Sequence, residues 1–178
     1  MFNHHTLLVG IGNKARHGKS YLADELLANM PRAVRVYHFS TALKCFVRVM
    51  GWMKEKDGTL LQLVGTEIFR DRMDEAIWIK CLEHQIAEDR PRVAVIPDCR
   101  YWNEARWILQ HGGIMVRVTR TNEDGTPWTS PDRDPIHRSE IDLDNWPWWN
   151  EEVIAPSGAL NTLVEGADRI TKTIKKIL

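Results

Sequence analysis

The sequence predicts a three-layer α/β fold, in which helices cover both faces of a short parallel sheet. Apolar strand-like runs alternate with helical stretches along most of the chain, without internal repeats. The first run, residues 6–11, reads TLLVGI, a continuous apolar stretch of the kind that is buried on both faces in a parallel sheet. A length of 178 residues, 43% of them hydrophobic, is that of a single domain with its own core.

The remaining elements follow the same rhythm. A helix is expected over residues 20–30, where Leu22, Leu26 and Met30 are one turn apart. Further strands are predicted at residues 34–39, 93–96, 114–118 and 153–155. Further helices are predicted at residues 41–50, 60–72, 74–88 and 103–111 and at the C-terminal end, with a polar loop over 51–58. Gly112 and Gly113 can end the helix over 103–111 in the left-handed conformation.

Residues 119–149 fit this pattern least, and we expect a lid or flap without regular core structure there. The segment is polar and dense in Asp, Pro, Thr and Arg. Its end carries an unusual cluster, Trp146, Pro147, Trp148 and Trp149. Packing of the flap onto the body is the default interpretation, and contact with a subunit partner or with a ligand are the alternatives.

A phosphate-binding motif lies between the first strand and the first helix. Residues 12–20 read GNKARHGKS, and Gly18, Lys19 and Ser20 match the second half of the Walker A pattern G-x-x-x-x-G-K-[ST]. That pattern needs inward N–H groups for phosphate, a lysine for the β and γ oxygens, and a hydroxyl for Mg²⁺. The first glycine of the pattern falls on Asn13, which tolerates positive φ, so the loop can still close. The alternative is a turn that merely caps the helix.

The motif predicts a P-loop NTPase fold that binds ATP, with Mg²⁺ on Ser20. Lys14, Arg16 and Lys19 supply positive charge, whereas His17 is expected to point its side chain to solvent and to carry no chemistry. The predicted ATP-binding residues are Asn13, Lys14, Ala15, Arg16, His17, Gly18, Lys19, Ser20 and Tyr21.

Composition limits the class of partner and the compartment. The 24 basic and 24 acidic side chains cancel, which argues against a nucleic-acid polymer and favours small-molecule nucleotides. The N-terminus has no positively charged start and runs into a strand, so we expect neither signal peptide nor membrane span, and a cytoplasmic protein. Cys45, Cys81 and Cys99 form no CxxC pair and are expected to be buried thiols rather than zinc ligands. A homodimer is left open.

Several segments resemble the deoxynucleoside monophosphate kinases of bacteriophages and their bacterial relatives. The similar segments are GNKARHGKSYLADEL, FSTALK at 39–44, LLQLVGTEIFRDRMDEAIWIK at 60–80, IPDCRYWNEARWILQHGG at 96–113, HRSEIDLD at 137–144 and VIAPSGALNTL at 153–163. The resemblance implies a nucleoside monophosphate kinase-like fold with a lid, which uses ATP and Mg²⁺ to phosphorylate a (deoxy)nucleoside 5′-monophosphate. The chain departs from the family at Pro156 and Ser157, beside the expected adenine site, and at Ser20 and Tyr21 after the lysine.

The resemblance also implies the acceptor site. The residues expected to line it are Lys44, Gly65, Thr66, Glu67, Arg70, Trp78, Asp98, Arg100 and Glu104. Those expected to act in catalysis are Lys19, Asp98, Arg100 and Arg120, with Arg133 and Arg138 as further lid arginines. Arg100 is expected to bind the acceptor phosphate, at the carboxyl end of the third strand, where open α/β sheets bind ligands.

Plainer roles remain open for some of these residues. Asp98 could cap the next helix, although Asn103 is the better N-cap candidate. Arg70 and Arg100 could form surface ion pairs, and Trp78 could be a core residue as readily as a base-stacking one. The alternatives for the whole protein are a P-loop kinase of another small acceptor or of a modified base in DNA, and a non-catalytic ATP-binding module.

Overall fold

The protein folds around a five-stranded parallel sheet with strand order β2-β3-β1-β4-β5. A computed structural model describes residues 6–52, 57–131 and 134–178, so half of the loop predicted at 51–58 and lid residue Arg133 lie outside the described residues. The strands are β1 (Leu7–Gly12), β2 (Val34–Val36), β3 (Val93–Cys99), β4 (Ile114–Thr121) and β5 (Glu151–Pro156). The predicted α/β class with a short parallel sheet is confirmed.

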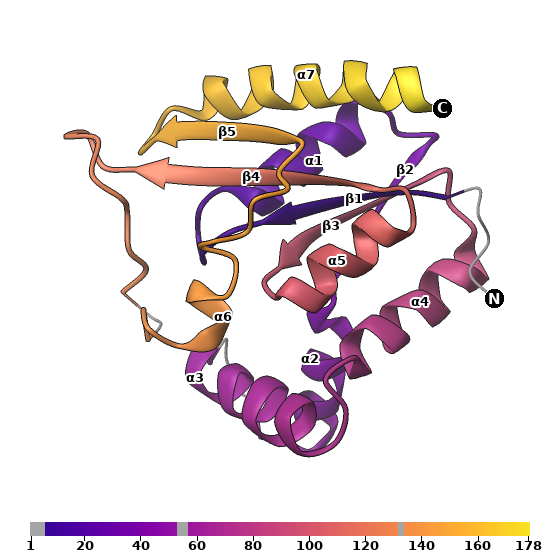
Figure 1. Cartoon of the computed structure of the whole chain (residues 1–178), viewed down its shortest axis with the longest axis vertical. Coiled ribbons are helices and arrows are strands. Elements are labelled where there is room, and N and C mark those ends of the chain that lie inside the picture. The colour runs from indigo at the N-terminus through magenta and orange to yellow at the C-terminus, as the bar shows by residue number, and fades with distance from the viewer. Residues whose placement is uncertain (1–5, 53–56, 132–133) are drawn as a thin grey trace.

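Helices cover both faces of this sheet, which makes the three layers (Figure 1). Helices α1 (Lys19–Asn29) and α7 (Leu160–Ile177) pack together on one face. Helices α5 (Trp102–Gln110) and α4 (Ile77–Asp89) lie on the other, with α2 (Ser40–Val49) beyond them. The short elements are α3 (Gly58–Gln62), the π-helix η1 (Leu63–Arg70) and α6 (Arg138–Ile141).

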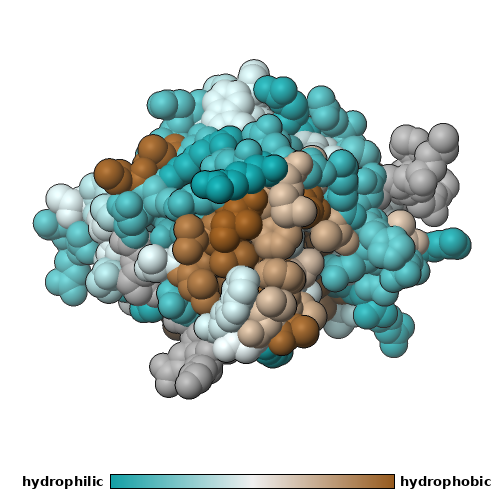
Figure 2. Space-filling view, turned by 90° about the horizontal axis from the view of Figure 1, so that it is seen from below, coloured by the Kyte–Doolittle hydropathy of each residue, from teal (hydrophilic) through white to brown (hydrophobic). Residues whose placement is uncertain are grey.

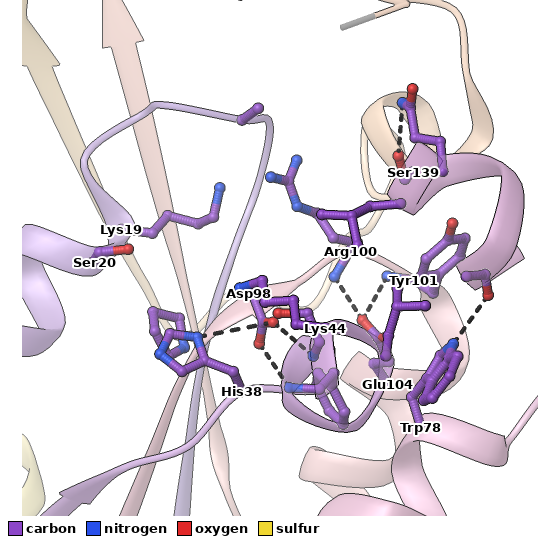
Figure 3. A pocket seen from close by; sticks show the side chains of 18 of the residues that line it. Lys19, Ser20, His38, Lys44, Trp78, Asp98, Arg100, Tyr101, Glu104 and Ser139 are labelled. Carbon is purple, nitrogen blue, oxygen red and sulfur yellow. Dashed lines mark hydrogen bonds and ion pairs between the residues drawn. The ribbon is translucent and has the colours of Figure 1, made fainter. Parts of the chain in front are cut away.

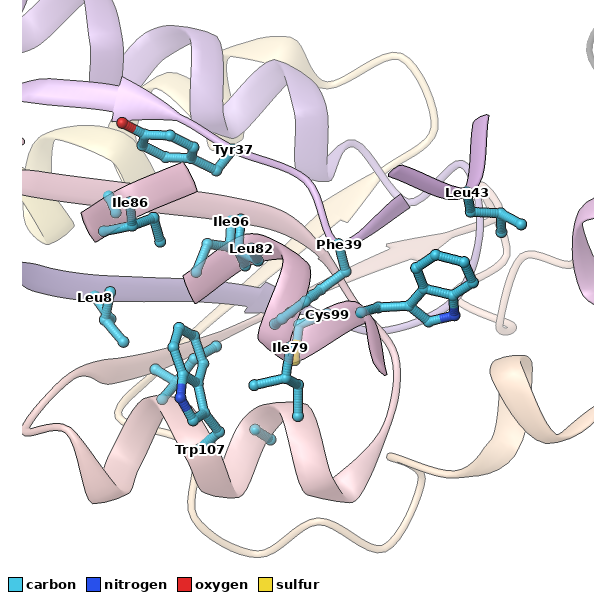
Figure 4. Packing of buried hydrophobic residues seen from close by; sticks show 14 of the residues in the cluster. Leu8, Tyr37, Phe39, Leu43, Ile79, Leu82, Ile86, Ile96, Cys99 and Trp107 are labelled. Atoms are coloured by element: carbon cyan, nitrogen blue, oxygen red, sulfur yellow. The ribbon is translucent and has the colours of Figure 1, made fainter. Parts of the chain in front are cut away.

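Each face of the sheet has its own apolar core. Leu8 on β1 points into the cluster shared with α4 and α5, which includes Ile96 and Trp107 (Figure 4). Its neighbour Val9 points into the opposite cluster, with Leu22 of α1. A central strand that is buried on both faces explains why its sequence is a continuous apolar run.

The region predicted as one helix over 60–72 is divided between α3 and the wider turns of η1. A π-helix widens the backbone locally and is frequent at functional sites. Gly65 lies in it, and a Cβ there would be 2.6 Å from Leu43 Cδ2 of α2. A larger residue at this position would force the Leu43 side chain to move, so glycine allows η1 to pack closely on α2.

The predicted lid is more structured than its composition suggests. Its first residues continue β4 to Thr121, and Leu143 and Trp146 are buried in the core. Trp146 lies edge-on to Trp102 with ring centroids 4.8 Å apart, so the packing interpretation is correct for this tryptophan. The Trp149 ring lies over Gly12, where an added Cβ would be 2.8 Å from it. Residues 143–149 thus anchor the end of the lid to the end of β1.

The outer face formed by α2, α3 and η1 carries an apolar surface, which is brown in Figure 2. Exposed apolar side chains in this part of the chain are Val49, Met50, Trp52, Leu63, Ile68 and Met73. Cys45 of α2 is also exposed and Cys81 is partly exposed, so the prediction that all three thiols are buried is correct only for Cys99. Within the described ranges, no helix has the length and apolar character needed to cross a bilayer.

Candidate active site

The loop between β1 and α1, residues 13–18, closes through backbone conformations that few residue types adopt. Asn13 has φ 114°, Arg16 φ 58° and Gly18 φ 92°. The expectation that Asn13 takes positive φ is confirmed, and its side chain has a second role. Its Nδ2 donates to Val118 O at 2.9 Å and to Thr119 Oγ1 at 3.0 Å. Asparagine therefore closes the loop and attaches it to β4.

Lys19 is the first residue of α1, and its side chain folds back over the β1–α1 loop. Its Nζ donates to Asn13 O at 2.9 Å and also to Lys14 O. The residue is buried, whereas the neighbouring Ser20 is exposed in the first helical turn. An ammonium group bonded to main-chain carbonyls above a helix N-terminus creates a local positive site suited to an anion.

His17 lies inside the loop, and the expectation that its side chain faces solvent is wrong. It is only 3% exposed. Its Nδ1 accepts from Arg120 N at 3.1 Å and its Nε2 donates to Trp128 O at 3.2 Å. Burial, and then the charge of Lys19, lower the pKa of His17 to about 4. A neutral His17 thus joins the loop to the end of β4.

Arg120, near the end of β4, lies beside His17 and is held by contacts with two other side chains. Its guanidinium lies 4.4 Å from the ring centroid of Trp128, and its Nε donates to Ser157 Oγ at 3.0 Å. The main cavity described below is not lined by Arg120 or by the predicted acceptor residue Glu67, which is exposed on η1.

A cavity of about 480 Å³ joins the β1–α1 loop to the carboxyl end of β3 (Figure 3). On the loop side it is lined by Ala15, Arg16, Gly18, Lys19, Ser20 and Tyr21. Of the predicted acceptor residues it is lined by Lys44, Gly65, Thr66, Arg70, Trp78, Asp98, Arg100 and Glu104. The structure therefore brings most of both predicted groups together around one space, but Asn13, Lys14 and His17 of the predicted ATP-binding group do not line it.

Asp98 caps a helix, although not the one that follows it in sequence. Its carboxylate accepts from Phe39 N at 2.9 Å and Ser40 N at 3.0 Å, at the start of α2. Helix α5 begins at Trp102 with Tyr101 as N-cap, so Asn103 as the N-cap residue is wrong. Asp98 remains partly exposed at the cavity wall, where its oxygens keep further lone pairs.

Arg70 and Glu104 form a buried ion pair beneath the cavity, so the surface ion-pair alternative is wrong for Arg70. Glu104 also accepts from Arg100 N at 2.7 Å and Tyr101 N at 3.1 Å. Burial raises the pKa of Glu104, and the Arg70 charge opposes the rise. Because each charge has a buried partner, this pair shapes the floor and holds the Arg100 backbone.

Trp78 is a buried wall residue. It is 5% exposed, and its Nε1 donates to Gly65 O at 2.9 Å. Its ring also contacts Phe69, with centroids 5.2 Å apart. These contacts favour the core interpretation, although the indole contributes to the cavity lining.

Glu140 of α6 is the prominent charged residue at the site that sequence reasoning left without a role. Its Oε2 accepts from Ala15 N of the β1–α1 loop at 2.8 Å. Both its oxygens accept from Arg100 Nη1, at 3.0 and 3.1 Å. The signal that could have found it is the HRSE segment, which the family resemblance singled out. Arg100 does form an ion pair, with Glu140, but their side chains are only 17% and 4% exposed. The surface ion-pair alternative is therefore also wrong for Arg100.

Comparison with known proteins gives one partial sequence match and a shared fold. No protein-family model matches the sequence. The chain is 56% identical over 64 residues to the deoxynucleoside-5′-monophosphate kinase of Escherichia phage T5. The match covers 33% of this chain and 26% of the phage protein, so it spans about a quarter of that relative's length. The resemblance to the phage-type enzymes is confirmed over this stretch.

Two solved structures resemble the whole chain. A candidate kinase from Chloroflexus aurantiacus superimposes with a TM-score of 0.54 at 12% identity, over 95% of this chain and 97% of that one. The tunicamycin resistance protein of Deinococcus radiodurans gives a TM-score of 0.48 at 12% identity, over 95% and 93%. The first likeness supports the predicted kinase-like fold.

Proposed function

We propose that this protein is a nucleoside monophosphate kinase, which transfers the γ-phosphoryl group of ATP to a (deoxy)nucleoside 5′-monophosphate. The observation that carries the proposal is the single cavity lined both by the β1–α1 loop and by residues at the carboxyl end of β3. A kinase must bring a donor and an acceptor into one water-excluding space. The partial similarity to the phage T5 enzyme supports a deoxynucleotide as the acceptor.

In this proposal one end of the cavity binds ATP and the other end binds the acceptor monophosphate. The ATP phosphates lie against the β1–α1 loop and the N-terminus of α1, with Lys19 on their outer oxygens. Lys19 must then exchange its carbonyl partners for phosphate. The acceptor phosphate lies beside Arg100, and transfer is in line without a covalent intermediate. Little covalent chemistry is needed from the protein, since phosphoryl transfer depends on positioning and charge.

Mg²⁺ would bind mainly through the nucleotide. The described residues include no cluster of three or more acidic, His or Cys side chains that could hold a metal ion. Mg²⁺ commonly takes one or two protein oxygens and completes its shell with phosphates and water. The Ser20 hydroxyl and the Asp98 carboxylate, both at the cavity wall, fit that requirement. The ion would neutralise the charge on the phosphate oxygens.

Coupled ADP release with a panel of nucleoside monophosphates tests the proposal. We expect ADP release to require both ATP and one of the monophosphates. ADP release with a nucleoside or with DNA that contains a modified base, and not with monophosphates, would identify a kinase of another acceptor. Binding of ATP without release under any condition would identify a non-catalytic ATP-binding module.

A further inference from the structure

We infer that Glu140 is the positioning residue of the site, which holds Arg100 against the β1–α1 loop so that its remaining nitrogens face the phosphate. This inference rests on the proposed function, and it assigns a role to the HRSE segment.

Glu140 connects the two halves of the cavity. One of its oxygens accepts from the amide of Ala15 on the loop side, at 2.8 Å. Both accept from Arg100 Nη1, beyond the end of β3. With 4% of its side chain exposed, the carboxylate is shielded from water, and charge-assisted bonds in such a setting are strong and directional.

Glu140 engages only one of the three guanidinium nitrogens. Within the described part of the chain, Nε and Nη2 of Arg100 make no hydrogen bond, whereas Nη1 has two carboxylate contacts. A guanidinium binds phosphate best through two parallel N–H groups, and these two nitrogens supply such an edge. Figure 3 shows the Arg100 guanidinium and the Lys19 ammonium turned toward the same space. The pKa of His17 is lowered mainly by burial, and the charges of Lys19 and, to a smaller extent, Arg100 lower it further.

The neighbours of Glu140 in the HRSE segment set its place. His137 Nδ1 accepts from Ser139 N at 3.1 Å, and Gln62 Nε2 of α3 donates to Ser139 Oγ at 3.3 Å. Arg138 turns away from the cavity and contacts Glu75 at 3.1 Å. On the other side of Glu140, Asp142 Oδ2 accepts from Trp102 N at 2.7 Å. The segment is therefore fixed on both sides of Glu140, whose carboxylate contacts both the loop and Arg100.

The test compares Glu140→Gln with a matched control from the same segment. Asp144→Asn removes the carboxylate that pairs with Lys14 at 2.9 Å, in a half-exposed ion pair that does not contact Arg100. The ¹⁵N relaxation of the Arg100 Nε–H group, assigned by its loss in Arg100→Lys, reports the order of the guanidinium. The apparent KM for monophosphate and the Kd for ATP are measured on the same proteins.

We expect the Arg100 Nε–H to be ordered in the wild type and in Asp144→Asn and mobile in Glu140→Gln. The KM for monophosphate should rise about 10-fold in Glu140→Gln, as expected for a lost charge-assisted bond. The Kd for ATP should change less than about 3-fold, because the glutamine oxygen can still accept from Ala15 N of the loop. The double variant Glu140→Gln/Arg100→Lys should be no worse than Arg100→Lys alone, because Glu140 acts through Arg100. If Glu140→Gln does not fold, Glu140→Asp serves, since the shorter side chain cannot span both partners.

Three results would overturn the inference. The first is an Arg100 guanidinium that is as ordered in Glu140→Gln as in the wild type. The second is a double variant in which the losses of the two single variants add. The third is tighter ATP binding in Glu140→Gln while Arg100 is still ordered. The last would make Glu140 a competitor of phosphate. If the wild type phosphorylates no monophosphate while Arg100 still loses its order in Glu140→Gln, the proposed function fails and the positioning role stands.

Discussion

The two ends of the cavity hold their charged side chains with different kinds of partner. On the loop side, Lys19 donates to main-chain carbonyls of its own loop. On the β3 side, charged side chains are neutralised by distant parts of the chain, as in the buried pair of Arg70 with Glu104. Carbonyl partners are neutral and can be exchanged for phosphate, whereas a buried ion pair loses several kcal/mol when one member is removed. The loop end is therefore suited to exchange partners with a ligand, and the β3 end to hold its shape.

Arg100 combines the properties of the two ends, because it has carboxylate partners and is also available to a ligand. Its backbone amide is held by Glu104 and its Nη1 by Glu140, yet it lines the cavity. It differs from Arg70 in that part of its guanidinium remains available. The comparison thus separates side chains that would change partners on nucleotide binding from those that would keep them.

The largest effect is expected for Lys19→Met at the loop end. Turnover should fall by at least roughly 100-fold, the scale for loss of one preorganised charge that stabilises the transition state. Coupled ADP release measures it, with circular dichroism to confirm folding. Lys80→Met, an exposed lysine of α4 paired with Asp74, is the control and should retain turnover. A folded Lys19→Met protein with most of its turnover would remove the loop end from the mechanism.

Arg100→Lys should have the next largest effect, at the β3 end. The KM for monophosphate should rise roughly 10-fold to 150-fold, because a lysine cannot supply two parallel N–H bonds. ATP affinity should barely change. Titrations of ATP, and of monophosphate at saturating ATP, measure the two effects. A fall in ATP affinity with an unchanged monophosphate KM would place Arg100 with the donor and contradict the division of the cavity.

The sequence predicts the loop end well because its information is local. Gly18, Lys19 and Ser20 are adjacent in the sequence, and a strand before them and a helix after them are enough to place them. The parallel sheet was predictable for a similar reason, since each buried strand is a continuous apolar run. Even the departure at Asn13 was interpretable from the φ values that asparagine tolerates.

The β3 end could not be predicted in the same way, because its contacts join residues far apart in the chain. Asp98 caps α2 across 58 and 59 residues, and Glu140 reaches Ala15 across 125. No spacing rule connects such partners. The burial of His17 has the same origin, since Trp128, which covers it, lies 111 residues away. The family resemblance marked these segments as important without indicating which side chains meet.

His17 gives a pH test of the connection between the loop and β4. The pKa of His17 in the folded protein is about 4, below the ordinary value of 6.5. Between these values the unfolded chain binds the proton and the folded chain does not, so the stabilising contribution is present above pH 6.5 and lost as the pH falls toward 4. At about pH 5, we expect the wild type to lose about 2 kcal/mol of unfolding free energy from this group.

His17→Asn should lack that pH-dependent loss. Urea unfolding at about pH 7.5 and pH 5 on both proteins measures the difference, and other titrating groups cancel in the comparison. An equal loss in both proteins would mean that His17 titrates normally and that its junction with Arg120 and Trp128 is loose.

The smallest effect concerns the lid, where the same contrast exists within one segment. Residues 123–127 are exposed, whereas Leu143 and Trp146 are buried in the core. A flap that excludes water must move to admit substrates, so one part of the lid should respond to ligands and the other should not. We expect ATP plus a monophosphate to slow amide exchange about 10-fold in the exposed part, since local opening controls exchange there. The amides of residues 143–149 should change little, and those of β1 serve as the rigid reference.

Equal protection of residues 123–127 with and without both ligands would mean that this part is no closing flap. The cavity would then have to exclude water through the residues that line it, and the division of the lid into a moving and an anchored part would be wrong.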